Sequence, residues 1–496
     1  MTDTTATDNR WTALYVLCAG MLMIVLDVTV VNVALPSIQD ELGFSTSNLA
    51  WVVNAYLIAF GGLLLLSGRF GDLLGRKRVL LAGLGVFTLA SLLCGIAWNQ
   101  ETLVAARFIQ GIGGAMTSAV ILGMIFTMFP EPRELAKAIG VYGFVASAGG
   151  SIGLLAGGVL TQSINYHWIF FVNIPIGIVT AVLSQRLVPQ DEGIGIRQGA
   201  DVGGALLITA CLMLAVYTIV GPAAQDGWGS AQALALLALS LALLAAFIVR
   251  ESRAATPLVP LRIFRSRTLS GANVVQALTV AGMFGMFFLG SLYLQRVLGY
   301  DALQIGLSFL PGTLIMGTLS LKFAEPLMMR FGARRVLVPG LALVTVGLLL
   351  FARVPVDGTY VVDVLPVMII MSVGIGVSFP PLIALAMAGA APQDAGLASG
   401  VVNTSAQVGG ALGLAILATV SASRSAHLAG GGTSAAAALT GGYHLAFLIA
   451  AGLVVAAITV ALLVLEPQPQ PQAAAHAEAP EQAEPAAAQQ VCSEVA

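Results

Sequence analysis

Long apolar segments follow one another along most of the chain, and short polar stretches separate them. Each segment is about 20 residues long, the length that an α-helix needs to cross a hydrocarbon core about 30 Å thick. The segments lack the strict alternation of apolar and polar residues that is typical of barrel strands. A spanning segment must also satisfy its own backbone hydrogen bonds. The pattern therefore predicts an all-α integral membrane protein.

Fourteen transmembrane helices are predicted. They cover residues 13–38, 49–68, 79–98, 103–127, 136–160, 167–187, 201–221, 231–249, 269–293, 302–324, 335–353, 361–387, 396–420 and 442–465.

The basic residues test this count, because cytoplasmic loops of membrane proteins carry an excess of Lys and Arg. With the N-terminus in the cytoplasm, 18 of the 22 basic residues fall in inward loops. Outward loops carry only Arg296, Arg353 and Arg424, and Arg107 lies within the fourth span. The segregation predicts fourteen helices with both termini cytoplasmic.

A short basic motif occurs twice. The run 75–80 (GRKRVL) follows the second span, and the run 332–337 (GARRVL) follows the tenth. Two pseudo-symmetric six-helix halves around a central path are a transporter architecture, and spans seven and eight form an inserted central pair. The expected units are a cytoplasmic N-terminus (1–12), an N-terminal half (13–187), the inserted helices with cytoplasmic linkers (188–268), a C-terminal half (269–465) and a disordered cytoplasmic tail (466–496).

Composition agrees with a membrane protein and excludes other classes. The chain is 58% hydrophobic and 9% charged, with a mean hydropathy of +0.92, whereas soluble domains are about 25% charged. A net charge of −2 gives no reason to expect nucleic acid as a partner. The four cysteines have no metal or CxxC spacing. No Ser/His/Asp set or phosphate-binding loop is present, so we expect neither an enzyme nor a metal or cofactor.

Asp27 is the only charged residue of the first span. A carboxylate at that depth costs several kcal/mol unless it faces a cavity, changes protonation or has a partner. It could therefore move protons, bind a cation or pair with a hidden base, and Arg107 in span four is a candidate for that base.

The loop 68–78 carries Gly68, Asp72, Gly75, Arg76 and Lys77. Its glycines allow a tight turn between two helices. Asp72 can cap a neighbouring helix N-terminus or pair with Arg76. The alternative is an ordinary positively charged cytoplasmic loop.

Two further spans carry polar or glycine motifs. In span four, Arg107 is followed by Gln110, and the alternative for Arg107 is a side chain that snorkels to the interface. Span five has a glycine face that suits close helix packing, and the alternative is plain packing without a transport role. Its glycines are Gly149, Gly153, Gly157 and Gly158.

These motifs resemble those of the major facilitator superfamily. With the runs 26–36, 51–56, 167–177 and 403–410, they are similar to the fourteen-helix drug:proton antiporter family over nearly the whole chain. The resemblance implies a proton-linked arginine at 107, a gate loop at 68–78 and an exporter-type glycine motif in span five. The chain departs from the family pattern at Leu73 (often basic), Leu154 (usually proline, which bends the helix) and Ala406 (often arginine).

The resemblance implies proton-driven efflux of hydrophobic or monocationic drugs across a bacterial inner membrane, by a monomer that works through alternating access. Asp27 and Arg107 would couple protons. Neutral hydrogen bonds in the cavity would come from Asn32, Asn54, Gln110, Gln276, Asn403 and Gln407. Met283 and Phe287 in span nine either pack against lipid or line an adaptable pocket, and His167 is expected to be an interface residue.

Two other functions stay open. The chain could export one endogenous metabolite, such as a self-made antibiotic, a siderophore or a lipid. It could also be a membrane receptor or scaffold that transports nothing.

Overall fold

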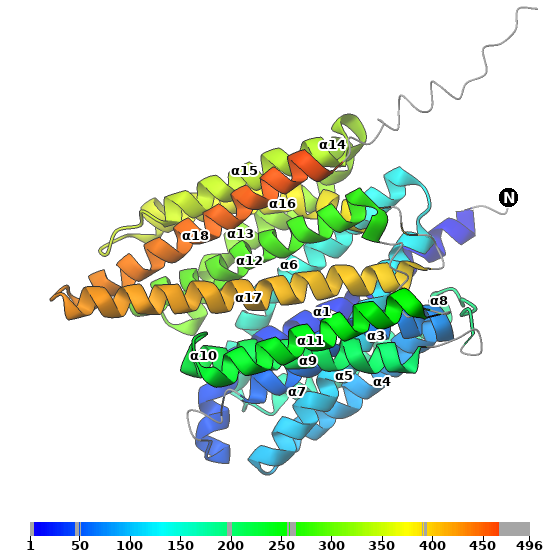
Figure 1. Ribbon diagram of the computed structural model, residues 1–496, viewed down its shortest axis with the longest axis horizontal. Helices are drawn as coiled ribbons and strands as arrows, with labels where there is room; N and C mark the ends of the chain where they lie inside the picture. Colours follow the sequence, from blue (N-terminus) through cyan, green and yellow to red (C-terminus); the bar gives the residue numbers. More distant parts are fainter. Residues whose placement is uncertain are drawn as a thin grey trace, which may run out of the picture.

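The computed structural model describes residues 4–44, 49, 51–195, 201–254, 257, 264–388, 390 and 394–465. All the regular elements in these ranges are helical (Figure 1), which confirms the all-α prediction. The predicted tail, 466–496, lies outside the described residues.

The helices follow the predicted spans in order. The first set is α1 (Thr4–Leu42), α3 (Trp51–Leu74), α4 (Arg76–Gly95), α5 (Gln100–Met128), α6 (Pro132–Ser163), α7 (Trp168–Phe171) and α8 (Asn173–Leu187). Next come α9 (Val202–Val220), α10 (Pro222–Asp226) and α11 (Ala231–Arg253). The last set is α12 (Arg267–Arg296), α13 (Ala302–Lys322), α14 (Ala324–Phe331), α15 (Ala333–Phe351), η3 (Tyr360–Val364), α16 (Leu365–Met387), α17 (Ala395–Gly430) and α18 (Ala435–Val464).

Thirteen helices among the described residues are long and apolar enough to cross a membrane. The segment predicted as span seven is helical, but it contributes only a shorter apolar run, Leu206–Ile219 within α9.

Several helices extend beyond the hydrophobic pattern that predicted them. α1 begins at Thr4, inside the segment predicted as an N-terminal extension, because the polar residues before Trp11 include neither Gly nor Pro to stop a helix. α17 has 36 residues and continues to Gly430, past the predicted end at 420. Apolarity marks the part of a helix that lipid can surround, whereas the helix itself ends where its backbone is capped or broken.

The helices pack in two groups (Figure 1). In the N-terminal group, α1 lies along α6 and α8, and α5 packs against both α3 and α4. In the C-terminal group, α12 packs on α17 and α18, and α15 packs on α16. We use the names N-terminal group for α1 to α8 and C-terminal group for α12 to α18.

The inserted helices α9 and α11 pack on each other, and α9 touches both groups through α3 and α17. The rings of Trp51 and Tyr217 stack 5.9 Å apart between α3 and α9. Gly62 lets α9 approach closely, since a Cβ there would lie 3.1 Å from the backbone nitrogen of Met213. The inserted pair thus covers one seam between the two groups.

The two groups meet toward one end of the bundle, which we call the basic end. It carries the N-terminus of α1 and the turns between α3 and α4 and between α14 and α15. There, the Ser320 hydroxyl donates to the Gly140 carbonyl (3.0 Å), and Arg133 pairs with Glu325 (2.7 Å). Gly68 packs against the backbone of Gly400 and its neighbours in α17. The described contacts between the groups therefore hold this end together.

Candidate functional site

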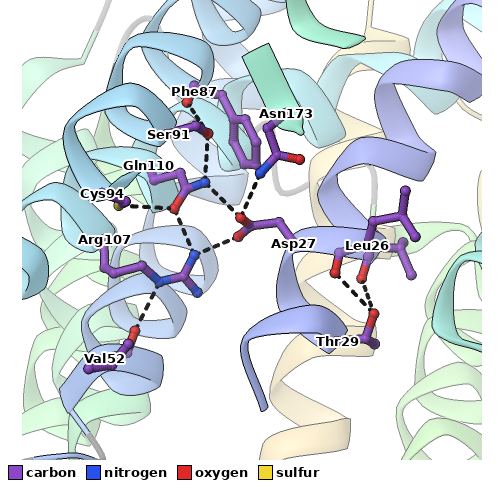
Figure 2. Close-up of polar contacts among 11 residues, drawn as sticks. Leu26, Asp27, Thr29, Val52, Phe87, Ser91, Cys94, Arg107, Gln110 and Asn173 are labelled. Atoms are coloured by element: carbon purple, nitrogen blue, oxygen red, sulfur yellow. Dashed lines mark hydrogen bonds and ion pairs between the residues drawn. The ribbon is translucent and has the colours of Figure 1, made fainter. Parts of the chain in front are cut away.

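The Asp27 side chain lies inside the N-terminal group, where several helices meet (Figure 2). α1 supplies Asp27, α5 supplies Arg107 and Gln110, and α8 supplies Asn173 at its first residue. All four side chains are at most 1% exposed. Arg107 and Gln110 are neighbours on one face of α5, and the crossing of α1, α5 and α8 brings Asp27 and Asn173 to them from distant parts of the sequence.

Three side chains donate hydrogen bonds to the Asp27 carboxylate. Arg107 Nη1 lies 2.5 Å from Oδ2, and Gln110 Nε2 lies 2.8 Å from Oδ1. Asn173 Nδ2 also donates to Oδ1 at 2.9 Å. The carboxylate is therefore fully engaged: it is neutralised by a base and oriented by two amides.

The Arg107 guanidinium is held on its other sides as well. Its Nε donates to the Val52 carbonyl of α3 (2.9 Å), and its Nη1 also donates to Gln110 Oε1 (2.7 Å). The Tyr56 ring lies 4.5 Å from the guanidinium carbon, a cation–π distance. Arg107 is buried and paired, so the structure does not support the alternative of an interface snorkel.

A second layer positions Gln110. Its Nε2 donates to the Ser91 hydroxyl (2.8 Å), which in turn donates to the Phe87 carbonyl (2.8 Å) of α4. The Cys94 thiol lies 3.6 Å from Gln110 Oε1. Gln110 thus belongs to the ion-pair network and is fully buried, whereas the family resemblance implied that its amide would offer a hydrogen bond in the substrate cavity.

Sequence reasoning missed Asn173 and Ser91. Asn173 is the first residue of α8 and follows the aromatic residues of α7. It is a single amide among apolar residues, and this was the sequence feature that could have marked it as a partner of Asp27. Its Oδ1 is buried without a hydrogen-bond partner among the described residues. This leaves one free acceptor directly beside the Asp27 carboxylate.

The predicted gate loop, 68–78, is mostly helical: it comprises the last residues of α3, the turn at Gly75 and the start of α4. Asp72 Oδ1 accepts from the Gly396 backbone N–H (2.9 Å), and Oδ2 accepts from the Leu397 N–H (2.8 Å). Arg76 Nη2 lies 3.0 Å from Asp72 Oδ1. Asp72 therefore caps α17 and pairs with Arg76 at the same time, and it joins the two groups at the basic end.

The rest of the loop is tied to its own group. Gly75 has a φ of +98°, which favours glycine. Lys77 Nζ donates to the carbonyls of Gln185 and Val188 at the end of α8 (2.8 Å each). The carboxylate of Asp191 accepts from the backbone of the same turn, a contact that the sequence pattern did not predict.

The glycine motif of α6 faces α1. A Cβ on Gly149 would meet Val25 at 2.9 Å, and one on Gly157 would meet the Val30 carbonyl at 3.0 Å. A Cβ on Gly153 would collide with the Thr29 hydroxyl. Gly158 has open space beside it. Three of the four predicted glycines thus allow α6 to approach the helix that carries Asp27, and the side chain of Leu154 lies outside the described residues.

The remaining polar residues predicted for the cavity are dispersed. Asn54 is buried, and Gln407 is half-buried beside Gly61. Asn403 Nδ2 donates to the Ser399 carbonyl (2.9 Å) and lies 3.4 Å from the Ser118 carbonyl across the groups. Gln276 donates a long bond, 3.4 Å, to the Val402 carbonyl. The side chain of Asn32 lies outside the described residues.

A small cavity lies in the C-terminal group, between α12, α13 and α16. Phe287 and Phe309 face each other there, with ring centroids 5.5 Å apart. Met283 does not line the cavity, although Phe287 of the same predicted cluster does. We call it the methionine pocket, and its lining is Met286, Phe287, Phe309, Gly312, Thr313, Met316, Met368, Met371, Ser372 and Ile375.

Comparison with known proteins points in one direction. Residues 17–414 match the model of the Major Facilitator Superfamily. The chain is 40% identical over 464 residues to the puromycin resistance protein of Streptomyces alboniger, covering 92% of each chain. It is 39% identical to the cephamycin export protein of Amycolatopsis lactamdurans, over 85% of this chain and 87% of that protein.

A solved structure agrees with this fold. The crystal structure of the human organic anion transporter MFSD10 (TETRAN) is similar to this one with a TM-score of 0.64, over 91% of this chain and 99% of that chain. The two sequences are 16% identical, so this likeness concerns the fold alone.

Proposed function

Because the chain belongs to the major facilitator superfamily, we propose that it exports hydrophobic, neutral or monocationic antibiotics and similar drugs, driven by protons. Two relatives that match over most of its length are named for puromycin resistance and cephamycin export. The observation that carries the proton part is the buried pair of Asp27 and Arg107, held by two amides in the N-terminal group.

The proposal includes the membrane arrangement. Counting α9 as a span adds a fourteenth helix to the thirteen candidates, and the N- and C-terminal groups are then two six-helix halves. The basic end carries the turns with Arg76 to Arg78 and Arg334 to Arg335, so the positive-inside rule places it in the cytoplasm. The protein would be a monomer in a bacterial inner membrane, with both termini inside.

Proton coupling would act through the Asp27 pair. Protonation of Asp27 removes the charge that holds the Arg107 guanidinium, so the contact between α1 and α5 weakens. The Asn173 amide suits both states: its N–H₂ donates to the carboxylate, and its free Oδ1 can accept from a protonated carboxyl after the amide rotates. Asn173 would thus keep a hydrogen bond to Asp27 in both protonation states, while the contact between α1 and α5 changes.

Cargo would contact the residues of the methionine pocket rather than Asp27, once the helices around them have moved apart, because the cavity of about 10 Å³ has room for only about one water molecule. Its lining has four methionines and two phenylalanines and no charged residue. Thioethers are flexible and pack well on aromatic edges, which suits cargo of varied shape. Because Asp27 is already neutralised by Arg107, a cation gains no strong attraction from it in this state. Apolar and aromatic contacts, rather than a charge attraction to Asp27, would therefore select the cargo.

The described contacts support an outward-facing state. Asp72, Arg133 and Ser320 each join the groups at the basic end. Export would require the groups to part there and close at the opposite end, which is alternating access. The second candidate is a dedicated exporter of one self-made antibiotic, because the relatives are named for single compounds.

The test is efflux of a fluorescent aromatic cation from proteoliposomes under an imposed pH gradient. Asp27→Asn should abolish gradient-driven efflux, while Asp226→Asn, an exposed acid at the end of α10, should leave it unchanged. Protonophore-sensitive efflux that continues unchanged in Asp27→Asn would remove Asp27 from the mechanism. A panel of unrelated drugs separates the two candidates, since a dedicated exporter moves only one of them.

A further inference from the structure

The loop after α8 runs back over the turn between α3 and α4. We call residues 188–195 the strap. Its backbone pairs with the end of α3: the Ile194 N–H donates to the Asp72 carbonyl, and the Gly195 N–H donates to the Leu73 carbonyl, at 3.0 Å each. Residue 72 is therefore held twice, by the strap through its backbone and by α17 through its side chain.

Asp191 caps α4 from this strap. Its Oδ2 accepts from the Arg76 N–H (2.7 Å), and its Oδ1 accepts from the Lys77 N–H (3.1 Å). These are the first two N–H groups of α4, and Gly75 before them supplies no side-chain cap. One carboxylate thus satisfies both N–H groups and lies at the positive end of the helix dipole.

The strap fits the turn closely. A Cβ on Gly193 would lie 2.6 Å from the Gly75 nitrogen, and a Cβ on Gly75 would lie 2.8 Å from the Asp191 carbonyl oxygen. Lys77 completes the arrangement through its two bonds to the carbonyls at the end of α8. The strap therefore holds the backbone from which the Asp72 side chain extends toward α17.

The matching turn of the C-terminal group lacks such a cap in the part of the chain that the structure describes. There, Gly332 has a φ of +82°, and Arg334 Nη2 donates to the Leu462 carbonyl at the end of α18, as Lys77 does at the end of α8. No side chain of that turn's own N-cap residue bonds α15. Both turns therefore have a basic side chain, Lys77 or Arg334, that bonds carbonyls at the end of a neighbouring helix. Among the described residues, the strap is found only at the α3–α4 turn, next to the Asp72 side chain that caps α17.

We propose that the strap is a clamp for the gate, and that Asp191 is a positioning residue that keeps the α3–α4 turn ready to cap α17. This rests on the proposed alternating-access function. The clamp lowers the ordering cost of closing the basic end, because the turn keeps its closed shape when Asp72 leaves α17. Without the cap, the closed state loses population, although Asp191 never touches cargo or the Asp27 pair.

The test measures the gate directly. Spin labels on cysteines that replace the exposed residues Arg78 and Arg335, in a transport-competent protein without its four native cysteines, report the distance between the groups at the basic end. We expect Asp191→Ala to lower the closed-to-open population ratio by at most about fivefold, because closing must then order a turn that the cap, worth about as much as a typical N-cap, had kept in place. Asp191→Asn keeps one acceptor oxygen and should shift the ratio less, in the same direction.

Glu192→Ala is the matched control, since it removes the same charge from an exposed neighbour and should match the wild type. Identical distance distributions for Asp191→Ala and Glu192→Ala would overturn the clamp. If Asp191→Ala does not fold, an unshifted distribution in Asp191→Asn would overturn it in the same way. A wild type that exports nothing would count against the proposed function instead, and the distance distributions would still decide the clamp.

Discussion

α1 and α12 are the first helices of the two groups, but they differ in the polar side chains that they bury. α1 buries a charged carboxylate, whereas α12 buries neutral amides and a hydroxyl. α1 carries Asp27, which has a base and two amides as partners. α12 buries Asn273, Gln276 and Thr279, each with one polar atom that lacks a partner among the described residues. The neighbouring methionine pocket is uncharged.

This difference leads us to expect different consequences of mutation in the two groups. A buried charge must be paired and hydrogen-bonded, so the N-terminal group is tightly specified around Asp27. An apolar pocket has no such requirement, and many side chains of similar volume can fill it. We expect substitutions in the N-terminal group to change coupling and stability, and substitutions in the C-terminal group to change which cargo is carried.

Breaking the buried pair should have the largest effect. In Arg107→Met, Asp27 loses its base, and removal of one partner from a buried pair costs about 3–5 kcal/mol. We expect a much lower unfolding temperature in detergent and no efflux. The double variant Asp27→Asn/Arg107→Met should recover most of the stability but none of the transport, because no charge is left stranded. A double variant as unstable as the single one would show that pairing is not what the site requires.

Phe287→Ala should act on cargo alone. The ring lines the methionine pocket and faces Phe309, and an aromatic contact of this kind is worth about 0.5–1.5 kcal/mol. We expect the KM for an aromatic cargo to rise about fivefold while dependence on the pH gradient stays as in the wild type. Phe288→Ala is the control, since Phe288 is similarly exposed (42% against 41%) but lies outside the pocket. An equal rise in both variants would argue against the pocket.

The smallest effect concerns the ion pair of the inserted helices. Asp201 caps α9 and pairs with Arg250 of α11 at 2.7 Å, where the Arg250 side chain is half exposed. The hydrogen bonds from Arg250 hold the pKa of Asp201 below its ordinary value. The stabilisation is therefore complete above the unfolded pKa of about 3.9, and it is lost as the pH falls through the lower folded pKa.

Thermal unfolding of the wild type and Arg250→Gln in detergent, from pH 7 to pH 3, measures this. The two unfolding temperatures should differ slightly and constantly above pH 5, and the difference should shrink below pH 4. A gap as large at pH 3 as at pH 7 would mean that Arg250 acts through packing rather than through the Asp201 charge.

The sequence was sufficient to predict an all-helical membrane protein and the order of its helices, but not where α1 and α17 begin and end. Continuous apolarity located the spans, and the need for an unusual reason to bury Asp27 singled it out. The partners Asn173, Ser91 and Asp191 could not be predicted, because an ordinary polar residue gains its role only from helices that cross far from it in the sequence. Gln110 was assigned to a cavity for the same reason: spacing shows which side of a helix a residue occupies but not what lies opposite.

α17 links the gate to the far side of the molecule. At a rise of 1.5 Å per residue, its 36 residues make a rod about 54 Å long, well beyond the thickness of a hydrocarbon core. Asp72 holds one end of this rod at Gly396 and Leu397. A tilt of about 10° around that end would move the other end by roughly 9 Å. Asp72 thus contacts the end of a helix so long that a small tilt there would become a large displacement at the opposite end of the bundle.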